Sequence, residues 1–225
     1  MIPINPPVTY IPLSRVEVDG KRLYASPDGK KLPSVTTILD KTKDKTHLLE
    51  WRKRVGEAEA NRISTESAGL GTLLHKHLEN WVEGKDRPQG NNLVHQMARD
   101  MSNVIIERGL CDVSEVWGQE TGLYYPDLYA GTTDLIGVYK GQPAIMDYKT
   151  TKKPKREDWI EDYYLQCCAY AHAHNKVYDT KIQKAVVFMV SRELDWQCFE
   201  LELDRFDAMS EKWAARVSEY YNKYS

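Results

Sequence analysis

Three strand-like segments follow one another between residues 115 and 150, and they constrain the fold of this chain more than any other feature. Their sequences are EVWGQETGLY, TTDLIGVYK and PAIMDYKT, in which β-branched and aromatic residues alternate with turn residues. The turn Lys140-Gly141-Gln142-Pro143 predicts that the second and third segments pair as a hairpin. We therefore expect a sheet built from this part of the chain.

Helical patterns lie on both sides of these strands. Apolar residues recur at helical spacing over residues 35–39, 47–63, 71–82, 93–108, 158–175 and 206–224. Two more strands, KAVVFMVS and WQCFELEL, come between the last two helices. This order predicts an α/β fold, with a central mixed β-sheet flanked by helices and a helical N-terminal part.

The length of 225 residues suits one domain with a sizeable core. We expect three parts within it: residues 1–32 form an extended arm and a hairpin around Asp19-Gly20, residues 33–110 are mainly helical, and residues 111–225 contain the sheet.

Composition excludes several classes of protein. The net charge of −2 means that bulk positive charge does not hold this chain to a polyanion, so any grip on DNA is local. The chain has no apolar run long enough to span a membrane and no secretory signal pattern, so we expect a soluble intracellular protein. Its four cysteines form no CxxC pair, and we expect reduced packing residues.

An acidic and a basic residue emerge together from the third strand. Side chains two apart on a strand point to the same face, so Asp147 and Lys149 project together. Pairing through the turn at Gly141 brings Asp134 close to Asp147. Two carboxylates suit a divalent cation such as Mg²⁺, and an ammonium stabilises the charge that develops during phosphodiester hydrolysis. The alternative is a solvated ion pair, since D-x-K alone is common.

Several motifs, in this order, resemble the RecB-like branch of the PD-(D/E)XK nuclease superfamily, which includes the mitochondrial genome maintenance exonucleases and related phage exonucleases. The resemblance extends over most of the chain from Pro33 onward. Its motifs are PSVTTIL (33–39), LEWRKR (49–54), GTLLHKHLE (71–79), GTTDLIGVYKG (131–141), DYKTTKKPK (147–155) and LQCCAYAHAHN (165–175).

The resemblance implies that the chain is one nuclease domain, residues 1–225, in which residues 33–110 grip DNA and residues 111–225 are the catalytic core. It implies a metal-dependent DNA exonuclease that uses Mg²⁺ or Mn²⁺. Its substrate would be DNA, mainly single-stranded ends, and the protein would act as a monomer.

Individual roles also follow from the resemblance. It makes Asp134, Asp147 and the Tyr148 carbonyl metal ligands and Lys149 the catalytic lysine. His75 matches a helix histidine that approaches the metal or the scissile phosphate. Glu79 follows His75 by four residues, so we expect it to anchor that imidazole. The alternative is that His75 is an ordinary core or surface histidine.

Gln166 and Tyr170 match the Q-x-x-x-Y pattern of the family and share one helix face. The resemblance implies that Gln166 lies near the metal site and acts in catalysis. It implies that Tyr170 either contacts DNA or packs in the core. Glu120 matches an acidic position that borders the site, where it would meet the substrate; an exposed strand glutamate is the alternative.

Basic and hydroxyl side chains are the expected DNA contacts. Lys152 and Lys153 begin a basic run directly after the catalytic strand, and residues 52–54 form a second basic cluster. Ser34 and Thr36 offer hydroxyl or helix N-terminal contacts to phosphate. Aromatic residues would stack on unpaired bases.

Three other functions compete with an exonuclease. An iron–sulfur nuclease of the same branch needs four cysteine ligands in a pattern that Cys111, Cys167, Cys168 and Cys198 do not supply, so we expect no such cluster. An endonuclease of the same fold would need a recognition element. A catalytically silent or structure-specific DNA-binding module would not need the Asp134, Asp147 and Lys149 set. We expect a cytoplasmic protein of a bacterium or a phage-infected cell, acting in genome degradation, recombination or repair.

Overall fold

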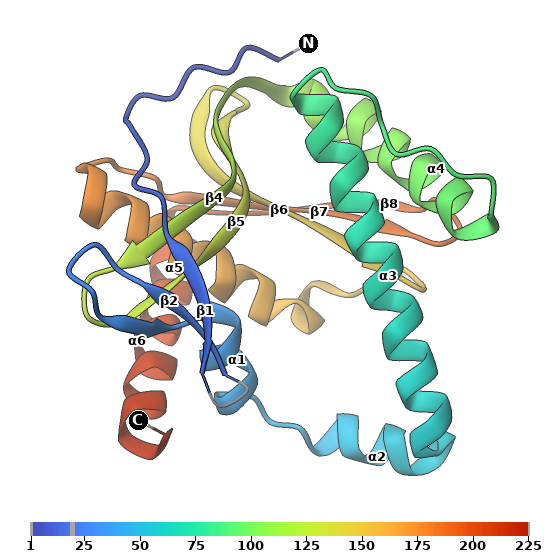
Figure 1. Cartoon of the computed structure of the whole chain (residues 1–225), viewed down its shortest axis with the longest axis horizontal. Helices are drawn as coiled ribbons and strands as arrows, with labels where there is room; N and C mark the ends of the chain where they lie inside the picture. The colour runs from blue at the N-terminus through green and yellow to red at the C-terminus, as the bar shows by residue number, and fades with distance from the viewer. Residues whose placement is uncertain (1, 19–20, 225) are drawn as a thin grey trace.

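The computed structural model describes residues 2–18 and 21–224, and a five-stranded sheet lies at its centre (Figure 1). The strands, in spatial order, are β4 (Val113–Tyr125), β5 (Tyr129–Tyr139), β6 (Gln142–Thr151), β7 (Lys184–Ser191) and β8 (Trp196–Glu202). Neighbouring strands are antiparallel, except that β6 and β7 are parallel. The predicted mixed sheet is therefore confirmed, and β5 and β6 form the hairpin that the turn at Gly141 predicts.

Helices cover both faces of this sheet, as Figure 1 shows. The helices of the fold are α1 (Val35–Thr42), α2 (Thr46–Val55), α3 (Glu57–Val82), α4 (Leu93–Arg108), α5 (Glu161–Tyr178) and α6 (Leu203–Tyr224), with short 3-10 turns η1 (Leu110–Asp112) and η2 (Glu157–Trp159). Alternate residues of β6 face different layers: Met146 and Tyr148 pack with α3 and α4, whereas Ile145 packs with α1, α5 and α6. The apolar core is thus two layers on one sheet.

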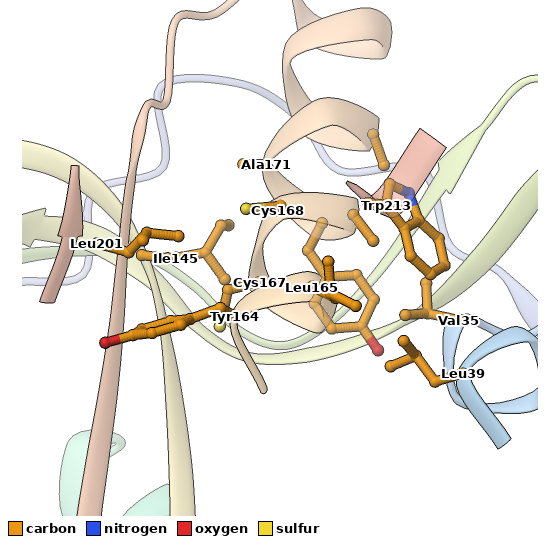
Figure 2. Packing of buried hydrophobic residues seen from close by; sticks show 14 of the residues in the cluster. Val35, Leu39, Ile145, Tyr164, Leu165, Cys167, Cys168, Ala171, Leu201 and Trp213 are labelled. Carbon is orange, nitrogen blue, oxygen red and sulfur yellow. The ribbon is translucent and has the colours of Figure 1, made fainter. Parts of the chain in front are cut away.

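Helix α5 is buried on most of its sides, because it lies between the sheet and the other helices (Figure 2). Its side chains at Leu165, Cys167 and Cys168 are fully buried. In Figure 2 they lie between Ile145 of the sheet and Trp213 of α6. Small alanine and cysteine side chains let the helix approach the sheet closely, which holds its N-terminal half near the end of β6.

The helices ahead of the sheet break at a different residue than the sequence predicted. The expected break lay between residues 63 and 71, but α3 runs through this stretch without interruption. The chain breaks instead at Gly56, between α2 and α3. Gly56 has a φ of +86°, which glycine adopts without the penalty that other residues incur. The 26-residue α3 is therefore one rod, about 39 Å long, that spans the molecule.

A smaller antiparallel sheet consists of β1 (Ser14–Val18), β2 (Lys21–Ala25) and β3 (Lys31–Pro33). The predicted turn at Asp19-Gly20 lies outside the described residues, but the strands on either side of it pair with each other. The arm before β1 runs along the edge of the large sheet, where the Asn5 N–H donates to the Val116 carbonyl at 2.8 Å. It covers part of an edge strand that would otherwise present unpaired backbone groups.

The buried imidazole of His174 on α5 predicts a pH dependence of stability. Its Nδ1 lies 2.7 Å from the Thr180 hydroxyl and its Nε2 lies 3.1 Å from the Tyr10 hydroxyl. Burial lowers the pKa of His174 from 6.5 to about 4. Between these values the unfolded chain binds the additional proton, so the free energy of unfolding falls as pH falls from 6.5 towards 4.

We expect the His174→Gln variant to lose part of this decline, measured as the difference in free energy of urea unfolding between about pH 7 and pH 5. His47→Gln is the control, because the His47 side chain is exposed. The idea fails if both variants show the pH dependence of the unmodified protein.

Candidate active site

The β5–β6 hairpin brings the two predicted aspartates to the same place. The ladder between these strands ends at the pair Leu135–Met146, and Asp134 and Asp147 are the next residue on each strand. Beyond that pair the Asp134 side chain replaces the backbone partner, because its Oδ2 accepts the Tyr148 N–H at 2.8 Å. The two carboxylates lie close enough that Asp134 raises the pKa of Asp147.

Asp147 and Lys149 form an ion pair at the end of β6. Lys149 Nζ lies 2.8 Å from Asp147 Oδ1 and 2.6 Å from Asp147 Oδ2, and Asp147 is 2% exposed. Burial and the nearby Asp134 raise the pKa of Asp147 to about 6, although Lys149 opposes this. Burial lowers the pKa of Lys149, but the carboxylates of Asp147 and Asp134 outweigh it and raise the pKa above its ordinary value. The lysine is therefore a cation at neutral pH.

His75 reaches this site from α3. Its Nε2 lies 3.0 Å from the Tyr148 carbonyl oxygen. A carbonyl only accepts hydrogen bonds, so this contact requires a proton on Nε2 and leaves the lone pair on Nδ1. Nδ1 lies 3.6 Å from Asp134 Oδ1 and 4.0 Å from Glu120 Oε1. The Tyr148 carbonyl, which the sequence assigned to a metal, thus orients the His75 ring.

The expected contact between Glu79 and His75 is not present. The Glu79 carboxylate pairs with Lys76 Nζ at 2.9 Å. The residue that takes the predicted place is Glu120, which lies on β4 opposite Asp134, between the pairs Gln119–Leu135 and Thr121–Thr133.

The backbone at Glu120 is unusual for a strand residue, since its φ is +45°. This left-handed conformation costs conformational energy, as is common at functional sites, and the carboxylate lies 4.0 Å from His75 Nδ1. The Glu120 side chain is 44% exposed, and partial desolvation together with the neighbouring Asp134 raises the pKa of Glu120 to about 7. The sequence assigned Glu120 to the substrate, but the geometry groups it with the candidate metal ligands.

The donor set fits a divalent cation. One ligand atom each from His75, Glu120 and Asp134 lies within 4.8 Å of the other two. Asp147 adds a buried carboxylate beside them, and its Oδ2 makes no hydrogen bond of normal geometry, although it lies next to the Lys149 ammonium. Several carboxylates crowded together repel one another, and a bound cation relieves that repulsion. A hard divalent metal is the group that these residues suit.

Helix α5 closes the other side of the site. Gln166 is half-buried and lies beside the hydroxyl of Tyr170, which is 3% exposed. Tyr170 packs so closely that a side chain at Gly131 would meet its hydroxyl at 2.8 Å. The structure therefore places the Tyr170 ring in the core.

Tyr163, which the sequence motifs did not identify, precedes Gln166 by three residues on the same helix face. The Lys149 ammonium lies 5.1 Å from the centre of the Tyr163 ring, and Lys155 donates to the Tyr163 hydroxyl at 3.0 Å. The helical spacing from Gln166 was a signal that could have identified this residue.

The remaining predicted DNA contacts fall into two groups. Ser34 is buried and caps α1, since its Oγ accepts the Thr37 N–H at 3.0 Å, so its hydroxyl serves the fold. Thr36, Lys152 and Lys153 are exposed and accessible to a ligand. Of the earlier basic cluster at residues 52–54, Arg52 is neutralised by an ion pair with Glu57.

Curated proteins related to this chain carry one name. Mitochondrial genome maintenance exonuclease 1 of Xenopus tropicalis is 24% identical to it, over 97% of this chain and 67% of the relative. The Homo sapiens protein of the same name is 26% identical, over 85% of this chain and 59% of the relative. The chain therefore spans about three fifths to two thirds of the length of these relatives. It matches no protein-family model.

In the described part of the chain, no helix has the length and apolar character needed to cross a membrane. The names of the relatives refer to mitochondria, so they lend no support to the bacterial or phage setting, which stays a prediction.

A solved structure of a candidate exonuclease from Eubacterium rectale shares the fold. It superposes with a TM-score of 0.53 at 11% identity, over 70% of this chain and 65% of that one. The curated relatives confirm the prediction of a nuclease at the level of the enzyme class. This chain is thus similar in sequence to the mitochondrial genome maintenance exonucleases, and it shares its α/β fold with the Eubacterium rectale structure.

Proposed function

We propose that this chain is a DNA exonuclease that hydrolyses phosphodiester bonds with the help of a divalent metal ion. One observation carries the proposal: the group of His75, Glu120 and Asp134 lies beside the Asp147–Lys149 ion pair, at the end of the core strands. The names of the relatives support the exonuclease activity.

The metal would be held by His75, Glu120, Asp134 and Asp147, with the Tyr148 carbonyl next to them. Carboxylate oxygens are the ligands that Mg²⁺ and Mn²⁺ prefer. When bound, such an ion polarises the scissile phosphate and lowers the pKa of a water molecule that attacks it. The Tyr148 carbonyl orients His75, so that Nδ1 faces the carboxylates.

Lys149 would stabilise the negative charge that develops on the phosphate. Its ammonium is partly exposed on one side and held in place by Asp147 and the Tyr163 ring. A cation fixed in this way needs no rearrangement when the charge develops. Gln166 and Tyr163 would keep this end of α5 against the lysine and the substrate.

The preferred substrate would be single-stranded DNA with a free end, because α3, in the helical part of residues 33–110, lines the cavity at His75 and Glu120. Residues 1–225 would then act as one nuclease domain and as a monomer, with residues 111–225 as the catalytic core. Exposed Thr36, Lys152 and Lys153 would contact the phosphates.

The test is a time course on end-labelled linear single-stranded, linear duplex and circular single-stranded DNA, with Mg²⁺, Mn²⁺ or EDTA. We expect degradation of linear single strands only, in either metal, and none with EDTA or in the Asp147→Ala variant. Cleavage of circles would indicate an endonuclease. Binding without cleavage in every condition would indicate the catalytically silent module.

A further inference from the structure

One face of α3 lines two neighbouring cavities. Residues at a spacing of four lie on one face of a helix, and on α3 these are Ile63, Ser67, Gly71, His75 and Glu79. The first two line a cavity of about 380 Å³, and the last three line one of about 430 Å³. The metal-ligand candidates His75 and Glu120 line the second cavity, and Thr150, which directly follows Lys149, lines the first. The cavities are adjacent, since a side chain at Gly71 of the second would lie 4.0 Å from the Thr150 hydroxyl of the first.

The two cavities differ in charge. The first, here called the basic pocket, is lined by Ser67, Thr150, Thr151, Lys152, Lys155 and Arg192. The second contains the carboxylates of Glu79 and Glu120, and its cation Lys76 is paired with Glu79. An anionic strand is therefore attracted at the first cavity and repelled at the second, away from any bound metal.

The cations of the basic pocket have no acidic partner. Among the described residues, no carboxylate lies within ion-pair distance of Lys152, Lys155 or Arg192, whereas Arg62 on the nearby α3 pairs with both Glu59 and Glu66. Glu59 is close enough to interact electrostatically with Lys152, but it forms no ion pair with it. Holding three half-buried or exposed cations together without an ion pair costs electrostatic energy, and an anionic ligand offsets that cost.

Arg192 is held in place for such a ligand. It follows β7, its backbone N–H donates to the Thr151 carbonyl at 3.0 Å, and its guanidinium donates to the Ser67 hydroxyl at 3.4 Å. Lys155 is held by the Tyr163 hydroxyl, whose ring also lies beside Lys149. Two cations fixed by neutral partners keep their full charge for an anion.

We propose that the basic pocket binds a backbone phosphate next to the scissile one, with Arg192 as its main ligand. This inference rests on the proposed nuclease function. Thr151 lies two residues beyond Lys149 on β6, roughly 7 Å away. That is the scale of one or two nucleotides, since the rise along the helix axis is about 3.4 Å per nucleotide in one strand of B-form DNA.

The test measures binding of a 16-nucleotide fluorescein-labelled oligothymidylate, in EDTA to prevent hydrolysis, by fluorescence anisotropy. We expect Arg192→Ala to raise Kd about 10-fold and to lower the slope of log Kd against log salt by about 1. Arg192→Lys, which keeps the positive charge, should lose less affinity than Arg192→Ala. Arg108→Ala, which removes an exposed arginine that lines neither cavity, is the control and should bind within twofold.

A second measurement locates the contact. A single methylphosphonate, which has no charge, is placed at each position of the oligonucleotide in turn. If Arg192 contacts one phosphate, replacing that phosphate should weaken binding to the unmodified protein but should have little further effect in the Arg192→Ala variant. We expect this non-additivity at one position only. With active enzyme and Mg²⁺, that position should be an immediate neighbour of the phosphate whose replacement blocks cleavage. Coupling spread over many positions, or coupling at a position that is not an immediate neighbour, would overturn the proposal.

The experiment distinguishes an error in the pocket proposal from an error in the proposed nuclease function, because the binding measurements need no cleavage. If each methylphosphonate substitution raises Kd by the same factor for the unmodified protein and for Arg192→Ala, the pocket proposal is wrong even if the protein is a nuclease. Thermal unfolding of each variant checks the fold. If Arg192→Ala unfolds, Lys155→Ala replaces it, with the same coupling expected at the same position.

Discussion

The Lys149→Ala variant is expected to cleave DNA about 10²- to 10³-fold more slowly than the unmodified protein, while its Kd for single-stranded DNA changes by no more than several-fold. The reason is that the Lys149 ammonium is a fixed cation, held by Asp147 and by the Tyr163 ring, at the place where phosphate charge develops. A cation that acts mainly in the transition state affects the rate more than the binding. The measurement is single-turnover cleavage with saturating enzyme, beside anisotropy in EDTA.

Lys140→Ala is the matched control for Lys149. Lys140 lies at the opposite end of the β5–β6 hairpin, where it pairs with Glu200 at 2.6 Å. The Lys140→Ala variant should cleave and bind DNA like the unmodified protein. Equal losses of rate and of affinity in Lys149→Ala would mean that the lysine mainly holds the substrate, which would contradict the role assigned to it. A lower melting temperature is also expected, because Asp147 loses the partner of a buried charge.

The second large effect concerns Asp134→Asn. The amide oxygen of asparagine can still accept the Tyr148 N–H, so the hydrogen bond that Asp134 makes at 2.8 Å is retained while the negative charge is removed. We expect cleavage to fall about 10³-fold, because a bound metal supplies several kcal/mol of transition-state stabilisation and about 1.4 kcal/mol is tenfold in rate. In EDTA the melting temperature should stay equal or rise, since a repelling carboxylate is gone.

A separate measurement tests the metal itself. Mg²⁺ or Mn²⁺ should raise the melting temperature of the unmodified protein, because a ligand that binds only the folded state stabilises it. Asp134→Asn should lose this rise, and Asp112→Asn, an exposed aspartate outside the site, should keep it. If Asp134→Asn responds to the metals as fully as the unmodified protein, Asp134 is not a ligand and the assigned site is wrong.

Local patterns in the sequence determined the core of the site. The alternation of side chains on a strand placed Asp147 and Lys149 on one face, and a four-residue turn set the pairing that brings Asp134 next to Asp147. The four-residue spacing of Gln166 and Tyr170 likewise places these two side chains together on α5. Each of these depends on the geometry of one strand, one helix or one hairpin, where neighbours in sequence are neighbours in space. The mixed sheet also followed from the order of such elements.

Contacts between distant segments were decided by the tertiary structure alone. Whether Glu79 or Glu120 meets His75 depends on how α3 packs on β4, and the sequence pattern favoured the wrong one. Arg192 reaches the basic pocket from the far end of β7, and no spacing in the sequence connects it with Ser67 on α3. Burial of Ser34 and Tyr170 likewise depends on the surrounding elements. Long-range packing chooses among residues of equal local suitability, because only the assembled layers determine which side chains meet.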